Sequence, residues 1–358
     1  MKFIRVIFSS VTKTKKEEKL VNVVYSTSDL YSEIAAVSIV SLFDNCQDIS
    51  EINVYIIDMG ISDRNKRRLE ELADHYSRKL VFLKNLNIEE LAGMHIDVGR
   101  WHISTFSRLF LIHVLPESVK KVIYIDCDMI ICHSLKELWE MDMGDTWVMS
   151  ADDCRGKLYR SNIGIPEDSI YTNNGLMVID LDAWRKNNVE KMFIDFIRRY
   201  NGDITYVDQG VLNGVFQPIK KVKLLPISYN AQTACYDLGY DGLQICRNPV
   251  WAYTREEFET GIADPIIVHF TTCFLSGTRP WIIGNQHPYR GEFIKYRNMT
   301  GWRDDPLWKD DTKFFKKIMT SICNILPKFL TFNIIRVFHV WVYPEIRIFK
   351  NAILGKAR

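Results

Sequence analysis

Two aspartates separated by one residue, Asp126 and Asp128, follow a short apolar run near the middle of the chain. Residues 122–125 of that run are too few for a helix and are rich in strand-forming types, so they predict a buried β-strand. Two carboxylates this close repel each other unless a cation or strong hydrogen-bond donors lie between them. A hard divalent metal ion is the simplest resolution, although a turn with solvated carboxylates has the same spacing.

The elements upstream of these aspartates alternate between strand and helix. Strand patterns at 21–26, 52–59 and 80–83 are separated by helical patterns at 32–43 and 63–76. This order predicts a doubly wound α/β sheet, in which ligands bind beyond the carboxyl ends of the strands. The first strand leads into a helix N-terminus, which suits a phosphate or nucleotide but equally a capped core helix.

One arginine lies among apolar residues of the predicted helix 102–115, just upstream of the two aspartates. Arg108 is suited to clamp a diphosphate or to buttress the carboxylates, because a guanidinium forms paired hydrogen bonds. The pattern fits equally well a helix residue whose head group reaches solvent.

Polar side chains also lie beside the later strand patterns. Asn173 and Asn174 precede a buried run, where their amides suit sugar hydroxyls or an ordinary turn. Asp208 and Gln209 open an apolar helical pattern, so they either cap that helix or face a reacting sugar. Asp153 follows the strand pattern 147–151 and is a candidate contact for an acceptor hydroxyl.

A histidine ends the short apolar run 266–268. His269 at the end of a core strand is most often structural, yet imidazole is also a common metal ligand. Beyond it, Gly277 permits close approach of backbone amides to an anion, and Arg279 offers bidentate contact to phosphate. Together these residues predict a loop that closes over a metal-bound diphosphate.

The composition fits a protein with a large core in a reducing compartment. The 358 residues are 47% hydrophobic and 25% charged, enough for one large α/β domain with an appendage or for two domains. The eight cysteines form no CxxC pair, which argues against a zinc module or a disulfide scaffold. Residues 1–20 form a basic leader that is expected to be neither a signal peptide nor a membrane span.

The C-terminal residues 306–358 carry a net positive charge, unlike the rest of the chain. From residue 312 onward there are nine basic residues and one acidic residue, so this segment is +8 while the rest of the chain is −6. Its apolar runs are interrupted at Pro327, Arg336 and Pro344, so none reaches the roughly 20 residues needed to span a bilayer. The pattern favours helices at an anionic membrane surface, or else a basic helical cap on the core. Many aliphatic residues are mixed with the aromatic ones, which disfavours nucleic acid as a partner.

The order of these segments resembles the family 8 glycosyltransferases. These are retaining enzymes that include bacterial lipopolysaccharide galactosyl- and glucosyltransferases and glycogenin. The resemblance extends over roughly residues 20–300, and it rests on seven segments in the family's order. The segments are VVYSTSDLYSEIAAVSIVSL, ISTFSRLFL, VIYIDCDMIICHSLKELWEMDMG, YTNNGLMVIDLDAWR, ITYVDQGVLNGVF, LPISYN and HFTTCFLSGTRPW.

The resemblance implies a GT-A type fold over residues 21–305: a doubly wound, mostly parallel sheet flanked by helices, with the basic helical appendage beyond it. It implies that Asp126, Asp128 and His269 hold a divalent ion, with Mn²⁺ preferred to Mg²⁺ because one ligand is an imidazole. Gly277 and Arg279 would hold the diphosphate. The uracil and ribose pocket would be lined by Ser26, Thr27, Ser28, Asp29 and Tyr31, and Cys127 is a further candidate for binding the donor. The donor sugar would be surrounded by Arg108, Asn173, Asn174, Asp208 and Gln209.

Three positions depart from the pattern of the family. The aspartate that often contacts the base falls at or beside Ser28, so either Asp29 replaces it or this contact is lost. Arg279 stands where lysine is common, in a loop that is longer than usual. Asn174 stands where a small residue is frequent, which leaves the identity of the transferred sugar open.

The expected function is metal-dependent, retaining transfer of a hexose, galactose or glucose, from a UDP-sugar to a saccharide or glycolipid acceptor such as lipopolysaccharide. Positive charge builds at the anomeric carbon as the diphosphate leaves. Gln209, with Asp208 beside it, is expected to position that charge without a stable covalent intermediate. The expected location is cytoplasmic, at the membrane face. A metal-dependent hydrolase and a sensor that binds sugar nucleotides without turnover are the alternatives.

Overall fold

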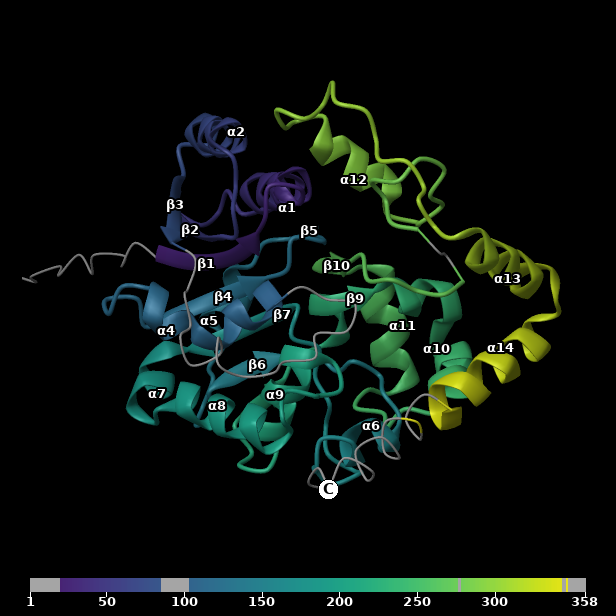
Figure 1. The fold of residues 1–358 in the computed structure, drawn as a ribbon. Helices are drawn as coiled ribbons and strands as arrows, with labels where there is room; N and C mark the ends of the chain where they lie inside the picture. Colours follow the sequence, from purple (N-terminus) through teal and green to yellow (C-terminus); the bar gives the residue numbers. More distant parts are fainter. Residues whose placement is uncertain (1–19, 85–102, 276–277, 343–345, 347–358) are drawn as a thin grey trace, which may run out of the picture.

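A seven-stranded sheet lies at the centre of the part of the chain that the computed structural model describes, namely residues 20–84, 103–275, 278–342 and 346 (Figure 1). The strand order is β3-β2-β1-β4-β7-β6-β8. The first four of these strands are parallel, β7 is antiparallel to both neighbours, and β8 is parallel to β6. The predicted doubly wound, mostly parallel sheet is therefore confirmed. Its strands are β1 (Leu20–Thr27), β2 (Glu51–Asp58), β3 (Lys79–Lys84), β4 (Lys121–Ile125), β6 (Val148–Ser150), β7 (Leu176–Asp180) and β8 (Val222–Leu224).

Helices cover both faces of this sheet (Figure 1). Because successive side chains of a strand point to opposite faces, Val23 and Tyr25 of β1 enter one buried cluster while Val24 enters another. The first cluster includes α1 (Ser32–Asn45), α2 (Asp63–His75) and α12 (Arg290–Arg297). The second includes α7 (Leu181–Lys186), α8 (Val189–Arg199) and α9 (Val207–Phe216). The other helices of the domain are α4 (Leu111–Val114), α5 (Lys136–Glu140), α6 (Lys157–Ser161), α10 (Thr233–Arg247) and α11 (Arg255–Ala263).

The predicted helix 102–115 is divided into a 3₁₀-helix, η1 (Ile103–Phe110), and α4, which follows it. The helical residues after β7 are likewise divided into α7 and α8 at Asn188, which is left-handed with φ 52°, a conformation that asparagine tolerates better than most residues. β8 ends at Leu224, and η2 (Ile227–Asn230) follows Pro226, because proline cannot donate to a strand ladder.

A second, three-stranded sheet joins distant parts of the chain. Its order is β5 (Met129–Ile131), β10 (Ile267–His269) and β9 (Ala231–Gln232). β10 is antiparallel to β5, with His269 opposite Met129, and parallel to β9, with His269 opposite Gln232. This register places His269 beside the residue that precedes β5, which is Asp128.

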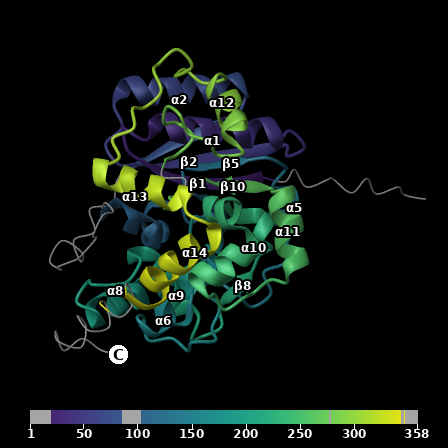
Figure 2. The ribbon, with the colours of Figure 1, turned by 90° about the vertical axis from the view of Figure 1, so that its right-hand side faces the viewer.

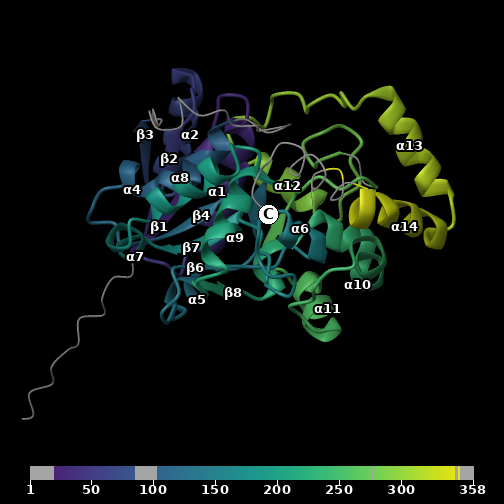
Figure 3. The same ribbon diagram turned by 60° about the horizontal axis from the view of Figure 1, so that its bottom comes forward.

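The C-terminal segment forms α13 (Phe314–Ile325), α14 (Lys328–Arg336) and the π-helical turn η3 (Val337–Val342). The predicted helical appendage is thus confirmed. Figure 2 and Figure 3 show α14 beside α10, where the Phe332 ring packs on Gly242, while α13 precedes α14 along the chain. None of the helices in the described ranges is long and apolar enough to cross a membrane.

Candidate active site

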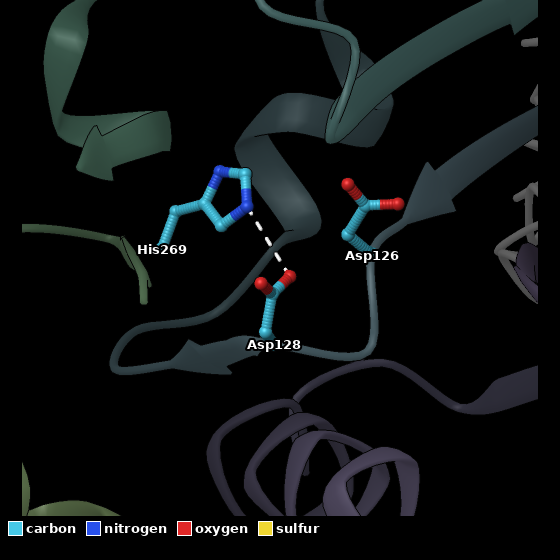
Figure 4. A group of neighbouring side chains, drawn as sticks. All are labelled: Asp126, Asp128 and His269. Carbon is cyan, nitrogen blue, oxygen red and sulfur yellow. Dashed lines mark ion pairs between the residues drawn. The ribbon is translucent and has the colours of Figure 1, made fainter. Parts of the chain in front are cut away.

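Three potential metal ligands meet where β4 ends. Asp126 follows β4 directly, and its backbone N–H donates to the Gly175 carbonyl, so the chain is fixed on leaving the sheet. Asp128 lies before β5, and His269 reaches it from β10 (Figure 4). One ligand atom from each of Asp126, Asp128 and His269 lies within 4.8 Å of the others. The structure therefore brings together two carboxylates and an imidazole that are far apart in sequence.

Each carboxylate of the pair also has an arginine partner. Arg108 Nη2 lies 2.8 Å from Asp126 Oδ1, and Arg279 Nη1 lies 2.9 Å from Asp128 Oδ2. Burial raises the pKa of Asp126, with Arg108 opposing. Burial would raise the pKa of Asp128 as well, but His269 and Arg279 outweigh it and lower the pKa to about 2. Asp128 is therefore ionised at any ordinary pH.

Arg108 joins the partly buried carboxylate of Asp126 to the buried carboxylate of Asp208. Besides Asp126, its Nε lies 3.1 Å from Asp208 Oδ2, and its Nη1 donates to the Asn174 carbonyl at 2.9 Å. The guanidinium lies over the Tyr124 ring at 4.6 Å, and the residue is only 8% exposed. The burial excludes a head group that reaches solvent, so Arg108 buttresses the carboxylates.

Buried amides form the wall next to this pair. Asn174 Nδ2 donates to Asp208, while Asn173 Nδ2 donates to Gln209 Oε1 at 3.2 Å. Gln209 Nε2 in turn donates to Asp153 Oδ2 at 3.0 Å. The four predicted residues Asn173, Asn174, Asp208 and Gln209 therefore lie next to one another, although they come from two separate segments of the sequence.

Asp153 is anchored by an arginine that the sequence analysis did not single out. Arg155 Nε lies 2.6 Å from Asp153 Oδ2, and its guanidinium lies over the Tyr206 ring at 4.5 Å. Burial opposes ionisation of Asp153, but Arg155 outweighs it and lowers the pKa of the carboxyl group. The sequence signal for Arg155 is its position two residues after Asp153. Nothing local distinguishes it from a surface arginine.

The predicted nucleotide pocket follows β1. The Ser26 hydroxyl accepts from Ser107 at 2.9 Å, and Cys127 Sγ donates to the Ser26 carbonyl at 3.3 Å. Asp29 Oδ1 accepts from Ser62 N at 2.8 Å, so this exposed carboxylate supports the start of α2. Tyr31 makes edge contacts with Trp281 and Trp308. Thr27 and Ser28 lie between Ser26 and Asp29, at the carboxyl end of β1. Gly277, the residue predicted to hold the diphosphate with Arg279, lies outside the described residues.

Comparison with known proteins establishes the family. The sequence model for glycosyl transferase family 8 matches residues 22–282. The chain belongs to glycosyl transferase family 8. General stress protein A of Bacillus subtilis is 29% identical over 292 residues, which span 80% of this glycosyltransferase and 96% of that protein.

Other relatives of this glycosyltransferase act on lipopolysaccharide by name. A lipopolysaccharide 1,2-glucosyltransferase of Escherichia coli is 24% identical and spans 82% of each chain. A lipopolysaccharide 1,3-galactosyltransferase of Salmonella typhimurium is 22% identical and spans 66% of each. Among solved structures, galactosyltransferase LgtC in complex with donor and acceptor sugar analogues shares the fold, with a TM-score of 0.67 at 23% identity over 79% of this chain and 99% of LgtC.

Replacement of Gly175 by alanine is expected to displace the histidine of the triad. A Cβ at position 175 would lie 2.5 Å from His269 Cε1 and 2.8 Å from Met129 Cε, closer than these atoms can approach. On the sequence-based expectation that the triad holds Mn²⁺, Gly175→Ala should therefore weaken Mn²⁺ binding by about tenfold or more, measured by electron paramagnetic resonance of free Mn²⁺. Gly291→Ala is the matched control, because its Cβ would meet no atom within 4 Å. Equal affinity in the two folded variants would contradict the expectation.

A second carboxylate near the wall predicts a pH-dependent stability. Asp152 is 1% exposed, and within the described ranges neither carboxylate oxygen has a hydrogen-bond partner. Burial raises the pKa of Asp152 to about 7, with Arg160 opposing. An acid whose pKa is raised by folding stabilises the protein while protonated, and this contribution is lost as the pH rises through the folded pKa.

Asp152→Asn should therefore unfold at higher urea concentration than the wild type at pH 8. The free energy of unfolding of the variant minus that of the wild type should be larger at pH 8 than at pH 5, by on the order of 2 kcal/mol. The reason is that the amide has the shape of the neutral acid and carries no charge that must be buried. Urea unfolding at both pH values measures this difference. Asp168→Asn, at an exposed carboxylate, is the control and should show no such difference. A parallel pH response in all three proteins would show that Asp152 is not the responsible group.

Proposed function

We propose that this glycosyltransferase moves a hexose, galactose or glucose, from a UDP-sugar to a saccharide acceptor with retention of configuration and with the help of a divalent metal ion. The single observation that carries the proposal is the convergence of Asp126, Asp128 and His269 at the carboxyl end of β4. The hexose is supported by the names of the glucosyl- and galactosyltransferase relatives. Retention is supported by the resemblance to the family.

The donor atoms of the triad fit a divalent ion. Two carboxylates and one imidazole suit Mn²⁺ better than Mg²⁺, which prefers oxygen ligands in an octahedron. Asp126, Asp128 and His269 would hold the ion, and when bound it neutralises charge on the departing diphosphate. Arg279, which lies against Asp128, would donate hydrogen bonds to the same diphosphate.

The residues around the triad receive the rest of the donor. The nucleoside is proposed to lie along the carboxyl end of β1, against Ser26, Thr27 and Ser28, with Tyr31 and Cys127 beside it. Asp29 contacts the base only with Oδ2, since Oδ1 accepts from the start of α2. Gly277 is proposed to join Arg279 at the diphosphate. The sugar lies over Arg108, Asn173 and Asn174.

Gln209 is the proposed group at the reacting face. Asp208 is 6% exposed and is already engaged by Arg108 and Asn174, so it is poorly placed to act as a nucleophile. The Gln209 carbonyl oxygen instead offers a neutral dipole to the positive charge that develops at the anomeric carbon. Asp153 is 1% exposed, so an acceptor hydroxyl reaches it only after neighbouring side chains move; its present contacts fix the Gln209 amide.

Product analysis tests the proposal. The protein is incubated with Mn²⁺, UDP-galactose or UDP-glucose, and lipopolysaccharide acceptors, and the products are resolved by mass spectrometry and NMR. Transfer yields UDP and a new glycoside whose anomeric configuration matches the donor. Free hexose without a glycoside would identify a hydrolase, and binding without UDP release would identify a sensor. Mass spectrometry of UDP-sugars that co-purify with the protein identifies the donor directly.

The two C-terminal helices are proposed to hold the enzyme at the cytoplasmic, anionic membrane face. One side of the pair packs on the domain through Cys323, Thr331 and Ile335, which are buried. The opposite side exposes apolar side chains beside basic ones: Phe314 is 79% exposed, Phe315 73%, Ile325 84% and Phe329 70%, next to Lys313, Lys316, Lys317 and Lys328. An apolar strip flanked by lysines suits the boundary of an anionic bilayer, where glycolipid acceptors lie.

Serine at the four most exposed apolar positions is expected to release the protein from anionic vesicles. The variant Phe314→Ser, Phe315→Ser, Ile325→Ser and Phe329→Ser leaves the docked side intact, so binding should fall by about tenfold or more without unfolding. Vesicle sedimentation at low and high salt measures it. The control is the double variant Leu30→Ser, Ile283→Ser. These two apolar side chains are 65% and 58% exposed and lie outside the C-terminal helices. Undiminished sedimentation of the tail variant would rule out this surface, and truncation after Asp311 should behave like the variant.

A further inference from the structure

Buried side chains connect the proposed catalytic amide to the proposed metal ligand through continuous hydrogen bonds. Asp153 accepts from Gln209 Nε2 at 3.0 Å and from Asn173 Nδ2 at 3.3 Å. Asn230 Nδ2 donates to Asn173 Oδ1 at 2.9 Å. Asn230 Oδ1 lies 2.9 Å from His269 Nδ1. The chain therefore runs from the reacting face to the triad without a gap.

The direction of every hydrogen bond in this series is fixed by two groups, one of which can only accept and the other of which can only donate. A carboxylate only accepts and a backbone N–H only donates. Asp153 therefore requires the NH₂ group of Asn173 on its side. The Gly175 N–H, 3.0 Å from Asn173 Oδ1, requires the carbonyl oxygen on the other side. The two anchors agree, so the orientation of the Asn173 amide is determined.

The orientation of Asn173 then determines the form of His269. Because Asn173 Oδ1 is an acceptor, Asn230 must turn its NH₂ group toward it, and Asn230 Oδ1 is left to accept from His269. The ring therefore carries a proton at Nδ1. His269 Nε2, which lies 3.2 Å from Asp128 Oδ1, is left as the ring nitrogen that would ligate a metal ion.

We propose that Asn230 is a positioning residue that holds His269 in its metal-binding form and couples that form to the orientation of Gln209. It is fully buried and ends η2 immediately before β9, whose pairing with β10 keeps it beside His269. A buried donor left without its acceptor costs the full desolvation of that group. The inference rests on the proposed metal site, and it adds a residue that takes no part in contacting metal or substrate.

Two substitutions at Asn230 should separate its two bonds. Asn230→Leu removes the acceptor for His269 Nδ1, so the Kd for Mn²⁺ should rise by about 10- to 100-fold in the absence of any sugar nucleotide. The Gly175 N–H still orients Asn173, so kcat at saturating Mn²⁺ should change by less than about fivefold. This variant therefore loses metal affinity more than turnover.

Asn230→Asp should show the opposite pattern. Its carboxylate still accepts from His269 Nδ1, so the Kd for Mn²⁺ should stay within about threefold of the wild type. Its second oxygen now faces Asn173 Oδ1, and two acceptors repel each other. The displaced Asn173 amide no longer orients Gln209, so kcat at saturating Mn²⁺ should fall by about tenfold or more.

Asn22→Leu provides the matched control. Asn22 is a buried asparagine near the start of β1, where its Oδ1 accepts from Asn53, so its replacement tests the general cost of losing a buried amide. Mn²⁺ binding is measured by electron paramagnetic resonance, folding by thermal melting, and the ring form of His269 by ¹⁵N NMR. Equal Mn²⁺ affinity in folded Asn230→Leu and wild-type protein would overturn the inference. Absence of Mn²⁺ binding by the wild type would instead overturn the proposed metal site.

Discussion

Asp128→Asn is expected to reduce glycosyl transfer by at least about 100-fold while the protein stays folded. Asp128 is the residue at which His269 and Arg279 meet, with its two oxygens 3.2 Å and 2.9 Å from them. The amide keeps the shape of the side chain but removes the charge that would hold a divalent ion. Arg279 can turn to solvent, because its side chain is 23% exposed, so little stability should be lost.

The measurement pairs activity with metal affinity. UDP release in the presence of acceptor gives the activity, and free Mn²⁺ by electron paramagnetic resonance gives the Kd. Asp264→Asn, at an exposed carboxylate, should be unchanged in both. EDTA should abolish transfer by the wild type, and added Mn²⁺ should restore it. Wild-type turnover in Asp128→Asn with unaltered Mn²⁺ affinity, or activity that persists in EDTA, would remove the metal from the chemistry.

Arg108→Met should lower the free energy of unfolding by about 3–5 kcal/mol. Arg108 is the buried cation between Asp126 and Asp208, and methionine would leave both carboxylates without it. Burial already raises the pKa of both carboxyl groups, with Arg108 opposing. Without Arg108 the folded state would take up protons at higher pH, so the loss of stability should be larger at pH 8 than at pH 5.

Urea unfolding at the two pH values measures this loss. Arg303→Met, at an exposed arginine, should be close to the wild type. Arg108→Lys keeps the charge and should lose less than Arg108→Met. Adding Asp208→Asn to Arg108→Met removes one of the unpaired charges, so the double variant should recover part of the stability. Lack of any recovery would mean that Arg108 acts through packing on Tyr124 and not through charge.

The sequence by itself determined the strands of the central sheet and the acidic residues at the carboxyl end of β4. Apolar runs of four to eight residues alternate with helical periodicity, and these signals depend only on neighbouring residues. They located β1, β2, β3 and β4, and the pair Asp126 and Asp128 at the end of the last of them. The order of motifs then predicted the family, which the match over residues 22–282 establishes.

The tertiary structure alone decided which distant side chains meet and in which direction their hydrogen bonds run. The β5 and β10 pairing places His269 beside Asp128, burial makes Arg108 an internal counter-ion, and packing places Arg155 on Asp153. Asn230 had no local signal, because its neighbours in LPISYN are unrelated to its partners His269 and Asn173. Short-range patterns record which residues a strand or helix buries. The burial of a charge and the direction of a buried hydrogen bond are set by groups from other strands, which only the folded chain brings into contact.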